Sequence, residues 1–265
     1  MNILLISPFN AVFNLLVLLS AAVLVVSSIY LRKKSERTRE IVLSTAVALC
    51  FVYFWFYKYS ISQDLDYARI CFEAGISTES FVWWSELPLH LCNINLMLLP
   101  IAVLTRNNYL KSFCFYTGPI GALMGLLMPP VGFDGYSLLL PRVCGFYVTH
   151  LAVLVSCIAL ASLGLYRPGF RKFPAAILSI IAVDLAVFAV NMILRLSGIF
   201  AYANYFYNIS TDGNAILDLF YNVIPIPFLY QLGCFLILIP YMCIVTGIYL
   251  AIEKISAKRQ PAAAE

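Results

Sequence analysis

The chain has few charged residues and only two histidines. Charged side chains make up 11% of its 265 residues, and hydrophobic side chains make up 62%. Soluble domains carry about 25% charged residues, so the shortage of charge excludes an ordinary soluble domain. A mean hydropathy of +0.90 agrees with this reading. The composition predicts an all-α protein that crosses a membrane several times.

Other absences narrow the organisation of the chain. No C-x-x-C pair occurs among the eight cysteines, so we predict mostly packing residues rather than disulfides. No H-E-x-x-H or comparable spacing indicates a metal site, and nothing in the sequence requires a cofactor. The first apolar run follows no charged n-region, which favours a retained helix over a signal peptide. We see neither a linker nor an internal repeat, and therefore predict a single domain over residues 1–265.

Seven apolar runs are long enough to cross about 30 Å of hydrocarbon as helices. They cover residues 9–31, 41–60, 86–105, 110–130, 142–165, 173–196 and 228–252. A short amphipathic helix is expected near 213–222, in the long loop before the last span.

The distribution of Lys and Arg predicts the orientation. Placing the loop after the first span on the cytoplasmic side puts thirteen of the seventeen cations there, in segments 32–39, 106–111, 167–172 and 254–259. The opposite side is acidic, especially in the loop 61–84. An even number of spans would break this alternation, so we predict seven spans, N-terminus out and C-terminus in. The net charge of +4 then reflects topology in a bacterial cytoplasmic membrane, and not nucleic-acid binding.

Polar residues within the spans indicate a site. Ionisable groups in hydrocarbon are costly unless they are paired or hydrated, so each one marks a candidate functional position. At 100° per residue, two stripes each share a helical face. The first consists of Glu86, His90 and Asn93, and the second of Asp184, Asn191 and Arg195.

A third span adds Arg142 and His150. With alternating directions these residues would meet in the outer half of the bilayer, in one hydrated cavity. A structural interpretation also remains open. The arginines could extend to the interface, Glu86 could cap a helix, and Asp184 could be held by one interhelical hydrogen bond.

The segment Leu87-Pro88-Leu89-His90-Leu91-Cys92-Asn93-Ile94, preceded by Trp84-Ser85-Glu86, resembles the YwaF-type bacterial integral membrane family of seven-span proteins. Asn204-Tyr205-Phe206-Tyr207 and Leu217-Asp218-Leu219 resemble its loop before the last helix, which implies a binding role for Asn204 and Asp218. This family is similar to the eukaryotic transmembrane protein 164 group. That similarity implies lysophospholipid acyl transfer by a cysteine and an adjacent histidine. The histidine corresponds to His90, and the cysteine position is Leu89.

The first hypothesis is a membrane-embedded acyltransferase or lipid hydrolase that acts on phospholipid or lysophospholipid. A histidine paired with a carboxylate could act as general base, with Arg142 or Arg195 holding a phosphate. In a covalent version Cys92 is the nucleophile and nearby His90 activates it.

Two other classes remain open. Asp184 and the two histidines could form the relay of a proton-coupled small-solute transporter, although we find no inverted repeat. A heptahelical sensor also fits the predicted topology, but the last span has no lysine for a retinal Schiff base.

Overall fold

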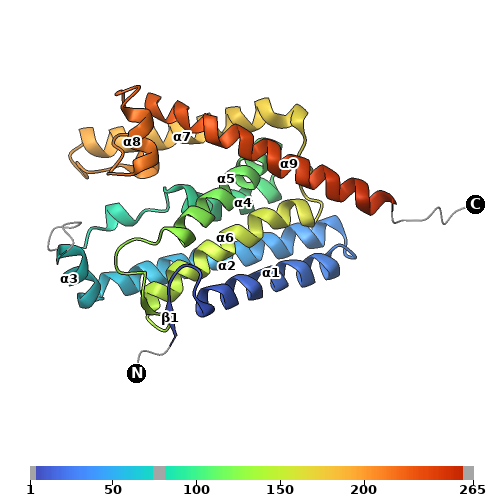
Figure 1. Ribbon diagram of the computed structural model, residues 1–265, viewed down its shortest axis with the longest axis horizontal. Coiled ribbons are helices and arrows are strands. Elements are labelled where there is room, and N and C mark those ends of the chain that lie inside the picture. The colour runs from blue at the N-terminus through green and yellow to red at the C-terminus, as the bar shows by residue number, and fades with distance from the viewer. Residues whose placement is uncertain (1–3, 74–80, 259–265) are drawn as a thin grey trace, which may run out of the picture. The chain divides into compact units, whose positions relative to one another are not determined.

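Figure 1 shows the computed structural model of the protein, which describes residues 4–73 and 81–258. Parts of two predicted segments, the loop 61–84 and the basic segment 254–259, therefore lie outside the described residues. The contacts divide the chain into two compact units, Met1–Tyr166 and Arg167–Glu265. Both units are built of helices, as the composition predicts, because a helix satisfies its own backbone polar groups in lipid.

The first unit is a helical bundle centred on its last helix. Its elements are β1 (Leu5–Ile6), α1 (Ala11–Leu31), α2 (Glu36–Ser62), α3 (Leu65–Glu73), η1 (Trp83–Glu86), α4 (Leu91–Leu104), α5 (Asn108–Leu127), β2 (Tyr136–Ser137) and α6 (Pro141–Ser162). α6 packs against α1, α2, α4 and α5, and α1, α2 and α6 run side by side (Figure 1). The two short strands pair antiparallel, with Leu5 opposite Ser137.

The starts of these helices follow from local chemistry. Asn10, Ser35 and Asn107 cap α1, α2 and α5, each with a side-chain oxygen that accepts from first-turn N–H groups. Pro141 opens α6, where its missing N–H is not needed. α2 begins before the predicted run 41–60. The residues of its first turn are polar, so hydropathy does not detect that they belong to the helix.

The predicted span 86–105 differs most from the structure. η1 ends at Glu86, residues 87–90 form no helix, and α4 begins only at Leu91. A proline disfavours the helical conformation of the residue before it, and Leu87, before Pro88, has ψ 143°. Glu86, His90 and Asn93 therefore do not share one helical stripe, which corrects the predicted spacing.

Cations from the neighbouring helix ends bind the carbonyl groups at the end of α6. Arg32 donates from Nε to the Ser162 oxygen at 2.5 Å, and Lys111 donates from Nζ to the Leu165 oxygen at 3.0 Å. The last carbonyls of a helix lack intrahelical donors and favour positive charge. The ends of α1, α5 and α6 are joined in this way.

Two ion pairs join α2 to the segment that contains α4. Glu40, at 0% exposure near the start of α2, accepts from Arg106 Nε at 2.7 Å, just after α4 ends. Near the other end of α2, Lys58 pairs with Glu86, before α4 begins. Lys58 follows Glu40 by eighteen residues, or about 27 Å of helix, so the segment 86–106 runs antiparallel to α2 over that length.

The second unit consists of η2 (Phe170–Lys172), α7 (Phe173–Leu196), η3 (Tyr205–Tyr207), α8 (Ala215–Tyr221), η4 (Leu229–Cys234) and α9 (Phe235–Lys258). η3 packs on α7, and η4 packs on α8 and α9. α8 confirms the short helix predicted near 213–222. A Cβ added at Gly233 would lie 2.3 Å from the Phe220 ring, so this glycine permits the close approach of η4 to α8.

Six helices of the described residues are long and apolar enough to cross a membrane. They are α1, α2, α5, α6, α7 extended by η2, and α9 extended by η4, while α4 is a shorter apolar helix of 14 residues. Only 6% of the apolar window of α1 is buried within the protein, against 67% for α5 and α6. The surface of α1 is therefore apolar and largely exposed, as expected of a helix that contacts lipid.

Candidate functional site

Cys92 and His150 lie close to each other in the first unit, where the thiol and the imidazole interact electrostatically. Cys92 lies in the first turn of α4 and is half-buried, whereas His150 lies in α6 and is 5% exposed. The sequence singled out both residues but paired Cys92 with His90. In the structure His90 is the N-cap residue of α4, and an imidazole that interacts with the thiol comes from another helix, α6.

The backbone of α6 fixes the tautomer of His150. Its Nδ1 lies 2.8 Å from the carbonyl oxygen of Phe146, one turn earlier. A carbonyl oxygen can only accept, so Nδ1 carries the proton and Nε2 of the neutral ring has a free lone pair. Nε2 is thus the atom available to accept the proton of the Cys92 thiol. The Phe146 ring also packs on the imidazole, with 4.2 Å between centroids.

Glycines of α5 make room for this pair. A Cβ added at Gly125 would lie 2.5 Å from both Cδ2 and Nε2 of His150. A Cβ at Gly121 would lie 3.6 Å from the backbone nitrogen of Cys92. Gly121 and Gly125 of this helix therefore serve packing, and what they pack against is the Cys92–His150 pair.

The start of α4 also matters for the chemistry near Cys92. No side chain caps the helix from His90, and the first N–H groups of a helix have no intrahelical acceptors. Cys92 thus lies at the positive end of a helix dipole, where backbone donors can stabilise negative charge. Asn93, the next residue, is half-buried in the same turn.

A buried ion pair adjoins the Cys92–His150 pair. Lys58 of α2 bonds Glu86 of η1, with side-chain exposures of 11% and 22%. The ammonium group lies 4.8 Å from the centroid of the Tyr57 ring and interacts electrostatically with both Cys92 and His150. Lys58 is one of the four cations that lie outside the predicted cytoplasmic segments.

Arg142 is held by the loops at its own end of the bundle. It is 3% exposed, pairs with Asp64 and donates from Nε to the Gly132 carbonyl at 3.1 Å. The rings of Tyr67 and Tyr136 flank its guanidinium at 5.7 and 5.0 Å. Burial raises the pKa of the Tyr67 hydroxyl, which keeps this ring neutral beside the cation. The guanidinium thus joins α6 to α3 and β2.

Asn95 is a buried polar residue that the helical stripes did not include. It is 1% exposed, and its Nδ2 donates to Thr117 Oγ1 at 3.4 Å, while the Cys157 thiol donates to its Oδ1 at 3.9 Å. These contacts join α4, α5 and α6 about one turn further along α4 than Cys92. Three positions separate Asn95 from Cys92, which is the helical spacing that could have revealed it.

The remaining predicted site residues belong to the second unit, where Asn191 organises a network. Its Nδ2 donates to the Tyr205 carbonyl at 2.9 Å and to Asn208 Oδ1 at 2.6 Å, and its Oδ1 accepts from the Tyr205 N–H at 3.0 Å. Asn208 Nδ2 in turn donates to Asp184 Oδ1 at 3.3 Å. The structure thus brings Asp184 and Asn191 together through Asn208.

The other three predicted residues bind the loop itself. Arg195 donates from Nε to the Ala203 carbonyl at 2.6 Å. Asn204 donates to Asp212 Oδ2 at 2.7 Å, and Asp218 accepts from Thr211 at 2.5 Å. These contacts fold residues 203–218 against the end of α7.

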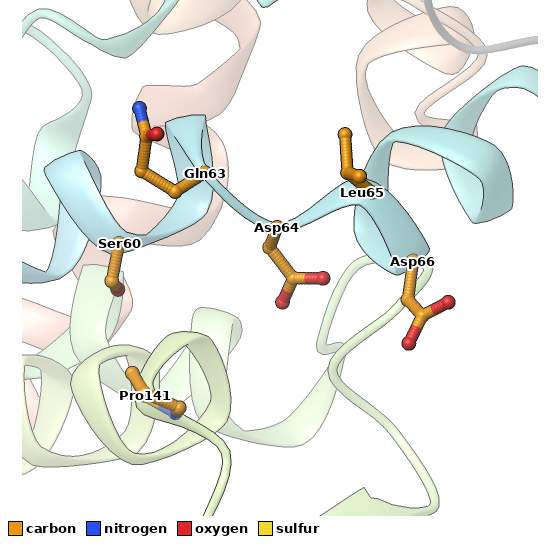
Figure 2. A pocket seen from close by; sticks show the side chains of 6 residues that line it. All are labelled: Ser60, Gln63, Asp64, Leu65, Asp66 and Pro141. Carbon is orange, nitrogen blue, oxygen red and sulfur yellow. The ribbon is translucent and has the colours of Figure 1, made fainter.

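A shallow surface hollow of about 540 Å³ lies where α2 meets α3. It is lined by Ser60, Gln63, Asp64, Leu65, Asp66 and Pro141. In Figure 2 the carboxylates of Asp64 and Asp66 extend to one side of the chain and the side chains of Gln63 and Leu65 to the other. Since Asp64 already binds Arg142, this hollow adds no further reactive group to the site.

The described part of the chain contains no group of three His, Cys, Asp or Glu side chains that could hold a metal ion. All eight cysteines are free thiols. The chemistry that the first unit can support is therefore that of a thiol, an imidazole and an ammonium group at the start of a helix.

Several long apolar helices with polar networks between them define a multi-pass membrane protein. The model of the TMEM164 family matches residues 5–246, most of the chain, and the protein belongs to this family. The match confirms the similarity to the transmembrane protein 164 group that the segment around His90 indicated. No curated protein and no solved structure matches the chain.

Proposed function

We propose that the protein is a membrane-embedded acyltransferase that moves a fatty acyl group between phospholipids through a thioester on Cys92. The observation that carries this proposal is the Cys92–His150 pair, which glycines of α5 accommodate and whose imidazole is oriented by the Phe146 carbonyl. A nucleophile, a neighbouring base and a group that orients the base form the arrangement used in covalent acyl transfer.

The first half-reaction forms the thioester. His150 Nε2 takes the proton of the Cys92 thiol, and the sulfur attacks the ester carbonyl carbon of a phospholipid. The tetrahedral intermediate collapses by breaking the carbon–oxygen bond, and the leaving lysophospholipid hydroxyl receives the proton from His150. No cofactor is needed, because over both half-reactions the acyl group passes from one oxygen ester to another of similar energy.

The second half-reaction regenerates the thiol. The hydroxyl of an acceptor lysophospholipid gives its proton to His150 and attacks the thioester carbonyl. The carbon–sulfur bond breaks, and the sulfur takes the proton back from the imidazole. With water as the acceptor the same steps amount to lipid hydrolysis, so exclusion of water from this half-buried site decides which reaction prevails.

Two features support stabilisation of the charge that develops on the substrate. The first-turn N–H groups of α4 can donate to the carbonyl oxygen as it becomes negative. The ammonium group of Lys58 lies close enough to Cys92 to interact with it electrostatically, and it can attract the phosphate of a lipid headgroup. Glu86 then serves to hold Lys58 in place rather than to act as the base.

The proposal includes one domain with seven spans, N-terminus out and C-terminus in. Although α4 has only 14 residues, its segment is paired with α2 near both ends, through Glu40 with Arg106 and Lys58 with Glu86. A segment that runs beside a spanning helix over about 27 Å covers most of the hydrocarbon core. The resemblance to the YwaF-type family favours a bacterial cytoplasmic membrane.

The direct test is to look for the acyl-enzyme. The purified protein is placed in vesicles of phospholipid with a radiolabelled acyl chain, together with unlabelled lysophospholipid. The wild type should carry label that hydroxylamine releases, as expected of a thioester, and should transfer label to the acceptor. Cys92→Ala should do neither. Cys50→Ala, which removes another half-buried thiol, is the matched control and should do both. Undiminished transfer by Cys92→Ala would overturn the proposal.

A further inference from the structure

Three cations from neighbouring helix ends surround the end of α6. Arg32 follows α1, Arg39 lies in the first turn of α2, and Lys111 lies in the first turn of α5. Each one donates to a different main-chain carbonyl: Arg32 Nε to Ser162 at 2.5 Å, Arg39 Nη1 to Leu163, and Lys111 Nζ to Leu165 at 3.0 Å. These acceptors lie within four consecutive residues, a stretch of at most about 11 Å. Three positive charges are thus gathered at one end of the first unit.

The end of α6 balances only part of this charge. A helix C-terminus carries about half an elementary negative charge, whereas the three side chains carry three positive charges. None of the three pairs with a carboxylate among the described residues. The buried carboxylate at this end, Glu40, is already shared by Arg37 and Arg106. The surplus is also visible in the sequence, because segments 32–40 and 106–111 contain seven cations and two acidic residues.

The two arginines also have N–H groups that are not used within the described part of the chain. A guanidinium has five N–H donors, and each of these two donates to one carbonyl only. The Nε atom of Arg39 is buried without an acceptor among the described residues. Arg32 is exposed and Arg39 is half-buried, so a ligand can approach both side chains from outside the bundle. What this end of the bundle lacks is a negatively charged acceptor.

Two local features hold the arginines in position. The Oγ atoms of Ser28 and Ser162 lie 2.7 Å apart, which fixes the end of α1, and with it Arg32, against α6. Gly164 ends α6 with φ 72°, and a Cβ added there would lie 3.3 Å from Nη1 of Arg39. This glycine therefore permits both the left-handed turn and the close approach of the guanidinium.

We propose that the adjoining ends of α1, α2, α5 and α6 bind a phosphate group through Arg32 and Arg39, with Lys111 adding positive potential. The planar N–H donors of arginine match phosphate oxygens, and a phosphate offers more of these acceptors than a carboxylate does. The phosphate can belong to a lipid headgroup or to a soluble anion. Twelve residues of α6, or about 18 Å, separate Ser162 from His150. The inference therefore does not depend on acyl transfer.

Thermal unfolding of the full-length protein in detergent tests this inference, because a ligand that binds only the folded state raises Tm. The probes are short-chain phosphatidylglycerol and sodium phosphate. Their controls are phosphatidylcholine with the same acyl chains, and sodium chloride at equal ionic strength. We expect at least one probe to raise Tm of the wild type saturably and beyond its control. A rise with phosphatidylglycerol alone identifies a lipid headgroup as the source of the phosphate, and a rise with sodium phosphate shows that a soluble anion is sufficient.

The variants separate this site from general effects of charge. Arg32→Gln and Arg39→Gln should each raise the half-saturating concentration at least about tenfold, because each removes charged hydrogen bonds to the phosphate. Arg32 is exposed, so Arg32→Gln tests the inference even if Arg39→Gln does not fold.

Arg69→Gln is the matched control and should behave as the wild type, because Arg69 is an exposed arginine of α3 that pairs with Asp66. Cys92→Ala should also keep the rise in Tm, even if acyl transfer is lost. Equal Tm with all four additives, or an unchanged half-saturating concentration in Arg32→Gln, would overturn the inference.

Discussion

At the scale of single residues, the two histidines differ in their position relative to Cys92. His150 interacts with the thiol and is oriented by the Phe146 carbonyl, whereas His90 is the N-cap residue of α4. We predict that His150→Gln lowers the rate of acyl transfer by about 10²–10⁴-fold, the usual contribution of a general base. His90→Gln should cost much less. Initial rates with labelled phospholipid check this, and a larger loss in His90→Gln would return the role of base to His90.

Gly125 offers a second test at the same scale, because it acts only through His150. A methyl group at this position would lie 2.5 Å from the imidazole, so Gly125→Ala must displace the ring or shift α5. We predict a loss of acyl transfer of more than about tenfold, with the labelled lipid still bound. Gly247→Ala on α9, where an added Cβ meets nothing within 4 Å, is the matched control and should keep its activity. Full activity of Gly125→Ala would show that the ring can move without consequence.

At the scale of elements, the Lys58–Glu86 pair joins α2 to η1 beside the start of α4. Removing one member of a buried ion pair leaves an unpaired charge and costs about 3–5 kcal/mol, whereas replacing both costs much less. We predict that Lys58→Met and Glu86→Gln each lower Tm strongly and that the double variant recovers part of the loss. Thermal unfolding of the three variants forms a double-mutant cycle. Strictly additive losses would mean that the two side chains do not stabilise each other.

The loop after α7 depends on one amide. Asn191, at 0% exposure, bonds both backbone groups of Tyr205 and the side chain of Asn208. Asn191→Leu keeps a similar volume but leaves these buried groups unsatisfied, at about 1–3 kcal/mol each. We predict much faster hydrogen exchange in residues 203–212, with α9 unaffected as the internal reference. Unchanged exchange in that segment would show that other contacts hold the loop.

At the scale of the whole molecule, the length of the apolar runs predicted the long helices well, because the bilayer imposes both their length and their apolar character. It misplaced the start of α4, because Pro88 interrupts a run that hydropathy alone reads as continuous. The site was predicted in part. His150 was identified as one of only two histidines, both in apolar segments, and Cys92 from its nearness to His90. Their pairing joins residues 58 positions apart and depends on how α4 and α6 pack. Lys58 and Gly125 became functional candidates only through their contacts.

Whether α4 crosses the membrane decides the topology, and the two possibilities place specific residues on different sides. With seven spans, Gln63 at the end of α2 and Asn108 at the start of α5 face opposite compartments. If α4 only enters and returns, both face the same one. Both residues are exposed, so single cysteines there should react with a membrane-impermeant maleimide from the side that each one faces.

We predict that Gln63→Cys is labelled in intact cells and that Asn108→Cys is labelled only after permeabilisation. The native protein, which has eight cysteines but only Cys243 exposed, provides the background. The positive charge near Asn108, from Arg106 and Lys111, favours the cytoplasmic side. Labelling of both variants in intact cells would mean that the protein has six spans. That result would conflict with the Glu40–Arg106 pair, because Glu40 lies at the opposite end of α2 from Gln63.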